Sequence, residues 1–333
     1  MNLIHTDFEI LDQESGLEGI YKAIEYPGRI CYGSTDKICD GSAEKFVKDT
    51  LMKFNHGAPM EHGAVYLDCP QNVYLKYVNN PYSRTCYVKE GDENNPITWL
   101  ENQENGMKIG YISNVTRYYV STNFRVLFDN GWLDDLKYLC EPTEHHMRRV
   151  TVKFTCDIGV SREYNRHRHD SINEESTRYC NYSKEKFGAG LNVIEPVWFY
   201  DRQEELDKHI RLNSFHKYVE SIYFNMDNYF NDIDYWLFAN YAAEWSYMNL
   251  TGKCQWQQQK ARTILPLDTK TTLIHTAFID DWVHYFNLRA LGTTGAPHPQ
   301  AKELAEPLLQ EFINRGYLND EMKNRLGKKQ NEY

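Results

Sequence analysis

No stretch of this sequence is apolar for long enough to cross a membrane. The first residues, Met1 to Asp7, have neither the basic start nor the apolar core of a signal peptide. The eight cysteines are scattered and include no Cys-x-x-Cys pair, which excludes the usual zinc spacings and disfavours a disulfide framework. We therefore expect a cytoplasmic protein that keeps its thiols reduced and does not bind membranes.

The chain also lacks a basic charge balance, an internal repeat and a low-complexity linker. Its net charge is −10, whereas a protein that binds nucleic acid through the phosphates needs a basic surface. Nucleic acid is therefore not expected as a partner, and any phosphate site must be local. With 333 residues and a hydrophobic content of 41%, the chain can bury a large core, and the missing linker favours one domain, 1–333, over two.

The hydrophobic pattern has the helical period in most segments and the strand period in a few, which predicts an α+β protein with a mixed β-sheet and packed helices. Helices are predicted over 42–54 with Ser42 as the cap, 206–224, 233–248, 254–262, 280–289 and 298–312. Strands are predicted over 64–67, 73–78, 150–156 and 271–278. The pattern also predicts a solvated loop over 89–96, a frayed tail over 323–333, a solvated helix start at His145 and His146, and buried thiols at Cys156 and Cys180.

The densest polar cluster of the chain lies at 166–178. Thirteen consecutive residues there hold three arginines, two histidines and three carboxylates. Arginine is the side chain best shaped for bidentate contact with phosphate, and several together indicate a polyanionic ligand. The interleaved Glu, Asn and Ser side chains can contact the polar edges of a base or a sugar.

The position of this cluster in the chain favours a functional site. The predicted strand 150–156 is followed by Ser161, which we expect to cap a short helix carrying Arg162, Glu163 and Arg166. Arg162 and Arg166 would then share one face of that helix. The cluster would lie where a strand gives way to a helix and the helix to a loop, as catalytic loops on rigid supports often do.

The stretch 166–178 closely resembles the signature of the flavin-dependent thymidylate synthases. In that signature Arg-His-Arg is followed at fixed offsets by Ser, Asn or Gln, Ser and Arg. The matching residues here are Arg166, His167, Arg168, Ser171, Asn173, Ser176 and Arg178. So many residue types in register make a far more specific pattern than a lone glycine motif.

Three other segments are similar to segments of the same family: 56–62 (His-Gly-Ala-Pro-Met-Glu-His), 261–266 (Ala-Arg-Thr-Ile-Leu-Pro), and 287–289 with the downstream Gln300. The sequence departs from the family in residues 64–149, which would form an insertion or subdomain relative to short members. It also departs at Ala58, where a hydroxyl residue often stands, and at Phe278 and His284, where some members have asparagine.

The resemblance implies a fold and a reaction. The fold would be the α+β fold of this family with a long insertion. The reaction would be the reductive methylation of dUMP to dTMP, with methylenetetrahydrofolate as the carbon donor and FAD, reduced by NADPH, as the hydride donor. It further implies a homotetramer with shared active sites, in which Arg262 and Arg289 act on a neighbour's ligand.

The resemblance also implies roles for individual residues. Arg289 would be the catalytic residue, stabilising negative charge on the uracil ring. The dUMP ligands would be Glu163, Arg166, Glu174, Ser176, Thr177, Arg178, Arg262 and Arg289. The FAD or folate ligands would be His56, Ala58, Arg166, His167, Arg168, Glu174 and His284. No metal ligand is expected.

Other interpretations stay open for the same residues. Surface ion pairs with Glu163, Glu174 and Glu175 could instead account for Arg166, Arg178 and Arg262. Arg289 could interact with a helix macrodipole. Two other functions are possible: a catalytically inactive nucleotide or flavin sensor, and a metal-dependent phosphohydrolase that uses His167, His169, Asp170 and Glu174. A serine nucleophile at Ser176 would need a base held by a third group, which the pattern does not supply.

Overall fold

The computed structural model describes residues 1–90, 97–101, 108–112, 115–210, 216, 219–220 and 231–328. The chain divides into two compact units. Unit 1 comprises Met1–Asp12, Glu25–Asp40 and Val150–Tyr333, and unit 2 comprises Gln13–Ile24 and Gly41–Arg149. Helix α1 (Gly16–Tyr32) contributes its first half to unit 2 and its second half to unit 1. The predicted insertion, 64–149, stays a prediction.

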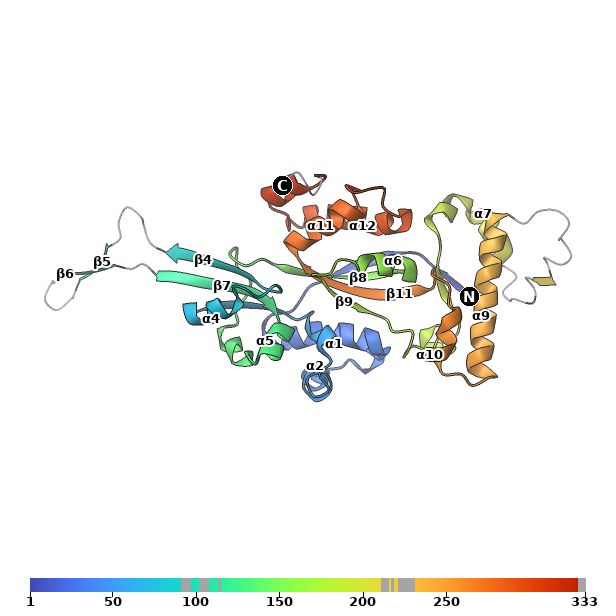
Figure 1. The fold of residues 1–333 in the computed structure, drawn as a ribbon, viewed down its shortest axis with the longest axis horizontal. Helices are drawn as coiled ribbons and strands as arrows, with labels where there is room; N and C mark the ends of the chain where they lie inside the picture. Colours follow the sequence, from blue (N-terminus) through green and yellow to red (C-terminus); the bar gives the residue numbers. More distant parts are fainter. Residues whose placement is uncertain are drawn as a thin grey trace. The chain divides into compact units, whose positions relative to one another are not determined.

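Unit 1 contains a four-stranded sheet with the order β2-β8-β11-β9, in which β2 pairs with β8, and β9 with β11, in antiparallel fashion. A separate parallel pair, β1-β10, ties the N-terminus to Asn192–Ile194. Figure 1 shows β8, β9 and β11 side by side. The strands are β1 (Asn2–Ile4), β2 (Asp7–Leu11), β8 (Arg149–Asp157), β9 (Ser171–Glu174), β10 (Asn192–Ile194) and β11 (Lys270–Phe278).

Two of these strands were predicted and are confirmed. Along β8, Val150, Val152, Phe154 and Cys156 are buried while their neighbours are partly exposed, as period-two alternation requires. Along β11 every residue from Thr271 to Phe278 is buried, which is typical of a strand covered on both faces. Strand β9 was not predicted, because its four residues are too few to show a period.

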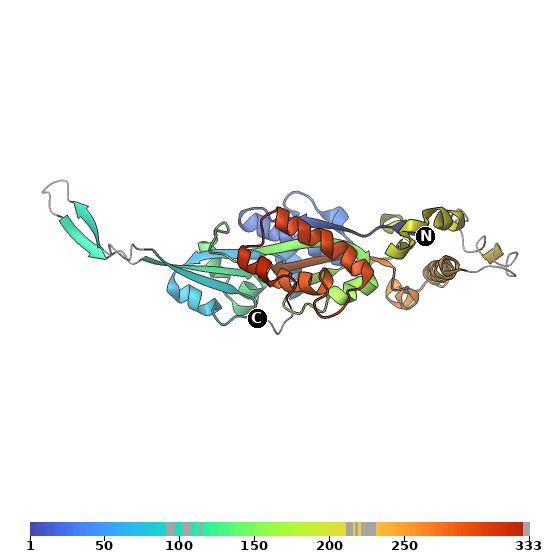
Figure 2. The same cartoon turned by 90° about the horizontal axis from the view of Figure 1, so that it is seen from above.

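Helices pack against this sheet. Figure 2 shows α12 (red) crossing the sheet, and α11 contacts both β11 and α12. Ala301, Leu304, Ala305, Leu308 and Phe312 form the buried stripe of α12, as predicted. The helical elements of unit 1 are η1 (Thr35–Lys37), α6 (Ile158–Tyr164), η4 (Glu185–Phe187), η5 (Val197–Arg202), α7 (Gln203–Ile210), α9 (Asp232–Gly252), α10 (Gln258–Ala261), η6 (Arg262–Ile264), α11 (Ile279–Arg289), α12 (Pro299–Asn314) and α13 (Asp320–Arg325).

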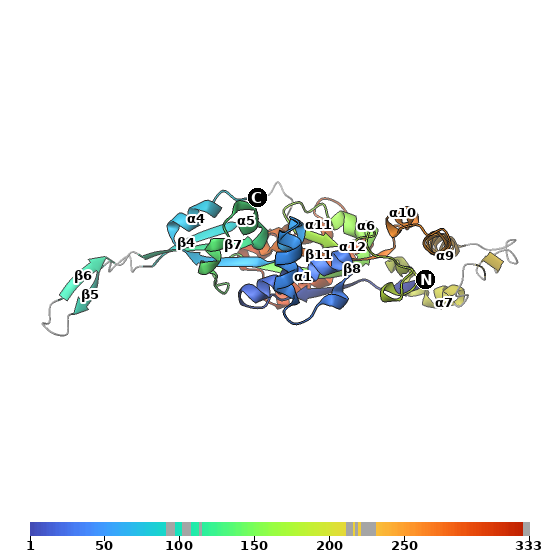
Figure 3. The same ribbon diagram turned by 90° about the horizontal axis from the view of Figure 1, so that it is seen from below.

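Unit 2 is built on a second antiparallel sheet with the order β3-β7-β4, which α4 and α5 contact (Figure 3). A further antiparallel pair, β5-β6, belongs to the same unit. The elements are α2 (Ser42–Phe46), the π-helical η2 (Val47–Met52), α3 (Gly57–Met60), β3 (Ala64–Cys69), α4 (Gln71–Tyr77), β4 (Arg84–Glu90), β5 (Ile97–Glu101), β6 (Lys108–Ile112), β7 (Val115–Asn123), α5 (Phe124–Asn130) and η3 (Leu133–Tyr138).

The predicted α+β class is confirmed, although the described strands form four small sheets. The strand predicted over 73–78 is wrong, because this stretch is helix α4. Val73 and Tyr77 are both buried in this helix, and their spacing of four residues is the period of a helix and not of a strand. The helix over 42–54 is confirmed as α2 and η2, with Gly41 rather than Ser42 at the cap, but Phe54 is 60% exposed.

Four other predictions, two of helices, one of the tail and one of a loop, differ from the structure in part or fall partly outside the described residues. The Gln-rich helix over 254–262 shrinks to α10, because Gln255 has a left-handed backbone (φ 56°) that breaks a longer helix. The prediction of a frayed tail is wrong for residues 323–325, because they belong to helix α13 and follow the buried Met322. Residues 329–333 lie outside the described part. The helix over 206–224 is described as α7 up to Ile210, and most of the remainder lies outside. The prediction of a loop over 89–96 is wrong for Lys89 and Glu90, because they are the last two residues of strand β4. Residues 91–96 lie outside the described part.

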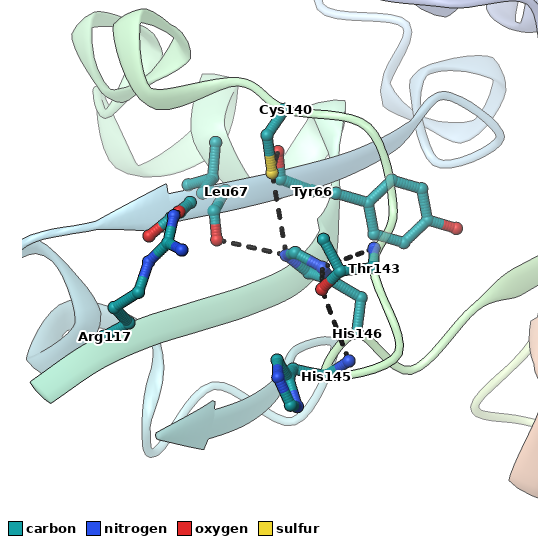
Figure 4. A network of polar contacts seen from close by, with 8 residues as sticks. Tyr66, Leu67, Arg117, Cys140, Thr143, His145 and His146 are labelled. Atoms are coloured by element: carbon teal, nitrogen blue, oxygen red, sulfur yellow. Dashed lines mark hydrogen bonds and ion pairs between the residues drawn. The ribbon is translucent and has the colours of Figure 1, made fainter. Parts of the chain in front are cut away.

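The prediction of a solvated helix start at His145 and His146 is wrong for His146. Its ring is buried, and Nε2 lies 3.2 Å from the Leu67 carbonyl oxygen and 3.9 Å from Cys140 Sγ (Figure 4). The Thr143 backbone N–H donates to Nδ1 (3.1 Å). Burial lowers the pKa of His146, so the ring is a neutral structural link between this turn and β3.

No helix in the described ranges is both long and apolar enough to span a membrane.

Candidate functional site

The site begins at the junction of β8 and α6. Asp157, not Ser161, caps α6, because its Oδ1 accepts a hydrogen bond from the Val160 N–H (2.6 Å). Ser161 therefore lies inside the helix, and α6 ends at Tyr164. Arg166 follows the helix instead of sharing a face with Arg162, which corrects the prediction.

The loop after α6 returns the chain to the sheet through a tight turn. The Asp170 N–H donates to the His167 carbonyl oxygen (3.2 Å), and β9 starts at the next residue. Ser171 then pairs with Thr276, and Glu174 with Leu273, on the buried strand β11. Strand β9 therefore attaches the polar cluster to the buried strand β11 of unit 1. This agrees with the prediction that the cluster lies where a strand is followed by a helix and the helix by a loop.

A pocket of about 620 Å³ opens beside this cluster. Four of the predicted dUMP ligands line it: Glu174, Ser176, Thr177 and Arg262. Its other lining residues are Cys31, Ile158, Arg162, Glu175, Thr263, Leu265, Pro266 and Leu267. Parts of the chain that are far apart in sequence therefore meet at one concave surface.

The two carboxylates of the pocket have different partners. Lys270 Nζ lies 2.8 Å from Glu175 Oε2, and both side chains are mostly buried. Burial raises the pKa of the Glu174 carboxyl. The Ser161 hydroxyl donates to Glu174 Oε1 (2.8 Å) and lies 3.0 Å from the Ile158 carbonyl oxygen, and its hydrogen bond to the carboxylate partly offsets the effect of burial on the pKa of Glu174.

The two arginines of the pocket keep their positive charge available. Arg262 Nη1 donates to Thr177 Oγ1 (3.2 Å), a neutral partner in the same chain. Across the described part of the chain, no carboxylate lies within ion-pair distance of Arg162 or Arg262. With Glu175 paired to Lys270, the two arginines outnumber the remaining carboxylate, Glu174, so the pocket is an electropositive site that suits an anion.

Arg289 does not line this pocket. Its Nη1 pairs with Glu163 Oε2 (2.6 Å), its Nη2 donates to the Glu163 carbonyl oxygen (2.7 Å), and its Nε contacts His167 Nε2 (3.4 Å). An ion pair with Glu163 was the alternative for Arg166, Arg178 and Arg262, but the structure gives it to Arg289, with side chains that are 15% (Arg289) and 32% (Glu163) exposed. The guanidinium is held in one orientation at the end of α11.

Burial keeps the histidines near Arg289 neutral. It lowers the pKa of His167 to about 3, helped by the nearby His275 and by the positive charge of Arg289. Burial likewise lowers the pKa of His284, whose ring lies 5.6 Å from that of His167. A neutral His167 can accept the Arg289 hydrogen bond, whereas a protonated ring could not.

The remaining predicted residues are exposed. Arg166, Arg168 and Arg178 extend from the surface of unit 1, and the Arg178 guanidinium lies 5.9 Å from the centre of the Tyr179 ring. His56 and Ala58 are exposed in unit 2, at the start of α3. Phe278, one of the departures from the family, is buried at the end of β11, so its side chain belongs to the core.

Sequence reasoning left several pocket residues out of the site. Arg162 and Glu175 are next to predicted ligands in the sequence, so this position could have indicated that they belong to the site. Thr263 follows Arg262 directly. Cys31 had no signal, because it comes from α1 and reaches the pocket only through the tertiary structure; the Ser176 N–H donates to its carbonyl oxygen (3.3 Å).

The cysteines and histidines of the described ranges do not gather into a metal site. No group of three or more His, Cys, Asp or Glu side chains could hold a metal ion there. Cys156 and Cys180 are fully buried, as predicted, and burial raises the pKa of both thiols.

Comparison with known proteins identifies the family. The family model described as "Thymidylate synthase complementing protein" matches residues 82–315. Among solved structures, the UMP/dUMP methylase PolB from Streptomyces cacaoi, bound with 5-Br dUMP, is 15% identical, with a TM-score of 0.38 over 94% of this chain and 93% of that one. Thymidylate Synthase X from Helicobacter pylori, with FAD and dUMP, is 11% identical, with a TM-score of 0.34 over 96% and 97%.

No curated protein sequence matches this chain. The family match spans well over half of the 333 residues and includes the cluster at 166–178. On that ground the chain belongs to the thymidylate synthase complementing protein family, the flavin-dependent thymidylate synthases.

Proposed function

We propose that the pocket of unit 1 binds dUMP for reductive methylation to dTMP. The observation that carries this proposal is the meeting of Ser176 and Thr177 with Arg262 at an electropositive pocket. Hydroxyl groups and a guanidinium are suitable ligands for a phosphate and a sugar. Arg162 lines the same pocket and is a further cation for the phosphate dianion.

The other predicted dUMP ligands surround this pocket in sequence. Glu174 faces the pocket, and its carboxyl group would contact the nucleotide there. Arg166, Arg178 and Glu163 would complete the nucleotide site. Arg289 would stabilise the negative charge that develops on the uracil ring when a nucleophile or hydride adds to it.

The residues around the signature loop fit a flavin. Arg166 and Arg168 are exposed, and within the described ranges no carboxylate pairs with either, so both can meet a pyrophosphate. His167 and His284 offer neutral rings, and His56 and Ala58 would contact the flavin or the folate. When bound, FAD would supply the hydride after reduction by NADPH, and methylenetetrahydrofolate would supply the carbon.

We further propose a homotetramer whose active sites combine residues of two subunits. Arg262 meets Thr177 of its own chain, whereas Arg289 lies outside the pocket and is held by Glu163 and His167. A site that needs both arginines can be completed when Arg289 comes from a second copy.

The test is dTMP formation from dUMP by the purified protein with FAD, NADPH and methylenetetrahydrofolate, omitting each component in turn. We expect product only in the complete mixture. Product without FAD or NADPH would contradict the flavin-dependent route. No product under oxygen-free, reducing conditions, with dUMP still bound, would identify a nucleotide sensor instead.

A further inference from the structure

A buried carboxylate–imidazole pair lies behind the signature loop. Asp170 Oδ2 is 2.6 Å from His275 Nε2, and the two side chains are 3% and 0% exposed. Asp170 ends the loop and His275 lies in the middle of β11. Neither residue lines the pocket or contacts Arg289, so the pair has no direct part in the proposed chemistry.

The His275 ring is fixed by its surroundings. It packs against Trp282 with 4.4 Å between the ring centroids and a tilt of 32° between the rings, and it meets the edge of Tyr285 at 5.6 Å. Its Nδ1 is buried without a hydrogen-bond partner. A carboxylate oxygen accepts hydrogen bonds, so the 2.6 Å contact assigns the proton to Nε2, which donates it to Asp170.

The Asp170–His275 pair fixes one end of the tight turn 167–170, and the buried side chain of His167 fixes the other end. In the turn 167–170 the Asp170 N–H donates to the His167 carbonyl oxygen, and His167 is buried against Arg289. Arg168 and His169, at the corner of the turn, are exposed. Two buried anchors therefore determine where the corner residues and the preceding Arg166 project.

We propose that Asp170 and His275 are positioning residues that hold the signature turn so that Arg166 and Arg168 can bind the flavin. This inference rests on the proposed function. A turn with one end released would sample many orientations, and small misplacements of binding groups are costly. Loss of the pair should therefore weaken FAD binding more than it affects turnover at saturating FAD.

Four variants test the pair, with FAD affinity, turnover and Tm measured for each. His275→Phe and Asp170→Ala remove one partner, His275→Gln keeps an N–H donor, and the double variant Asp170→Ala/His275→Phe leaves no buried charge. Asp135→Asn is the matched control, because Asp135 is a buried carboxylate paired with Lys76 and Tyr77 in unit 2. FAD affinity is measured by quenching of flavin fluorescence, well below the Tm of every variant.

We expect the dissociation constant for FAD to rise at least about tenfold in His275→Phe and Asp170→Ala, and to stay near the wild-type value in His275→Gln and Asp135→Asn. The double variant should regain Tm without regaining FAD affinity. Recovery of both in the double variant, or an equal loss in Asp135→Asn, would mean that the pair only compensates buried charge and would overturn the proposal. A wild-type protein that binds neither FAD nor dUMP would instead refute the proposed function.

Discussion

Arg289 is the residue on which the proposed chemistry depends most. Its three nitrogens contact Glu163 and His167, so its orientation is fixed before any ligand arrives. Such preorganisation is what makes a cation effective against charge that develops in a transition state. The same contacts make it a structural residue, and the two roles can be separated by experiment.

Arg289→Ala should lower kcat/KM for dUMP by about 100-fold or more, the usual effect of removing one preorganised donor. Its cost in the free energy of unfolding should stay at or below about 2 kcal/mol, because the remaining Glu163 is about one-third exposed and can be hydrated. Steady-state kinetics and urea unfolding measure the two effects. Arg315→Ala is the control, since it removes an exposed helix pair with Glu311; unchanged specific activity in Arg289→Ala with a large loss of stability would contradict the catalytic role.

His167 should make the stability of the protein depend on pH. Its pKa is lowered to about 3 in the fold and is about 6.5 in the unfolded chain. Between these values the unfolded state binds the proton and the folded state does not, so the free energy of unfolding falls as the pH falls below 6.5. From pH 7 to pH 5 this loss amounts to about 2 kcal/mol.

His167→Gln should remove about 2 kcal/mol of the difference between urea unfolding at pH 7 and at pH 5. His5→Gln, which changes an exposed histidine of the same unit, should leave that difference unchanged. If the two variants behave alike, the buried imidazole does not carry this part of the pH dependence.

At the scale of elements, α6 determines where the pocket begins. The helix starts one turn earlier than Ser161 because the carboxylate of Asp157 caps it. This shift places Ser161 inside the helix, where its hydroxyl contacts Glu174. Ser161, which the sequence predicts as a helix cap, is therefore a hydrogen-bond partner of the pocket residue Glu174.

Asp157→Ala should cost about 1–2 kcal/mol in the free energy of unfolding and weaken dUMP binding, because α6 would fray at the end that carries the pocket. Asp157→Asn keeps the capping oxygen and should lose little of either. Calorimetric titration with dUMP and thermal unfolding of both variants distinguish the cases. Equal effects of the two substitutions would show that the charge, rather than the cap, is what matters.

At the scale of the whole molecule, the proposed shared site predicts complementation. Arg262→Ala and Arg289→Ala should each be nearly inactive, and co-expressed chains should regain activity, because some sites would receive an intact Arg262 from one subunit and an intact Arg289 from another. Light scattering should give about four times the chain mass of 39.4 kDa. Mixed tetramers without activity would mean that both arginines serve the same site from one chain.

Sequence alone determined much of this protein. The alternation along β8 and the apolar stripe of α12 specify their buried faces, because burial forces a period of two on strands and of about 3.6 on helices. The signature stretch 166–178 indicated the family and three residues of the pocket, Glu174, Ser176 and Thr177, and the segment 261–266 indicated a fourth, Arg262. Short elements gave no such signal, and β9 and α4 were missed or misassigned because four to seven residues barely define a period.

Tertiary structure decided how the site is assembled. Only the folded chain brings Cys31 of α1 into the pocket, places His275 behind Asp170, and separates Arg289 from Arg262. These relations join residues more than a hundred positions apart in most cases, and no local pattern encodes them. Burial also decided which groups carry charge: it is the environment, not the residue type, that keeps His167 neutral and raises the pKa of Glu174.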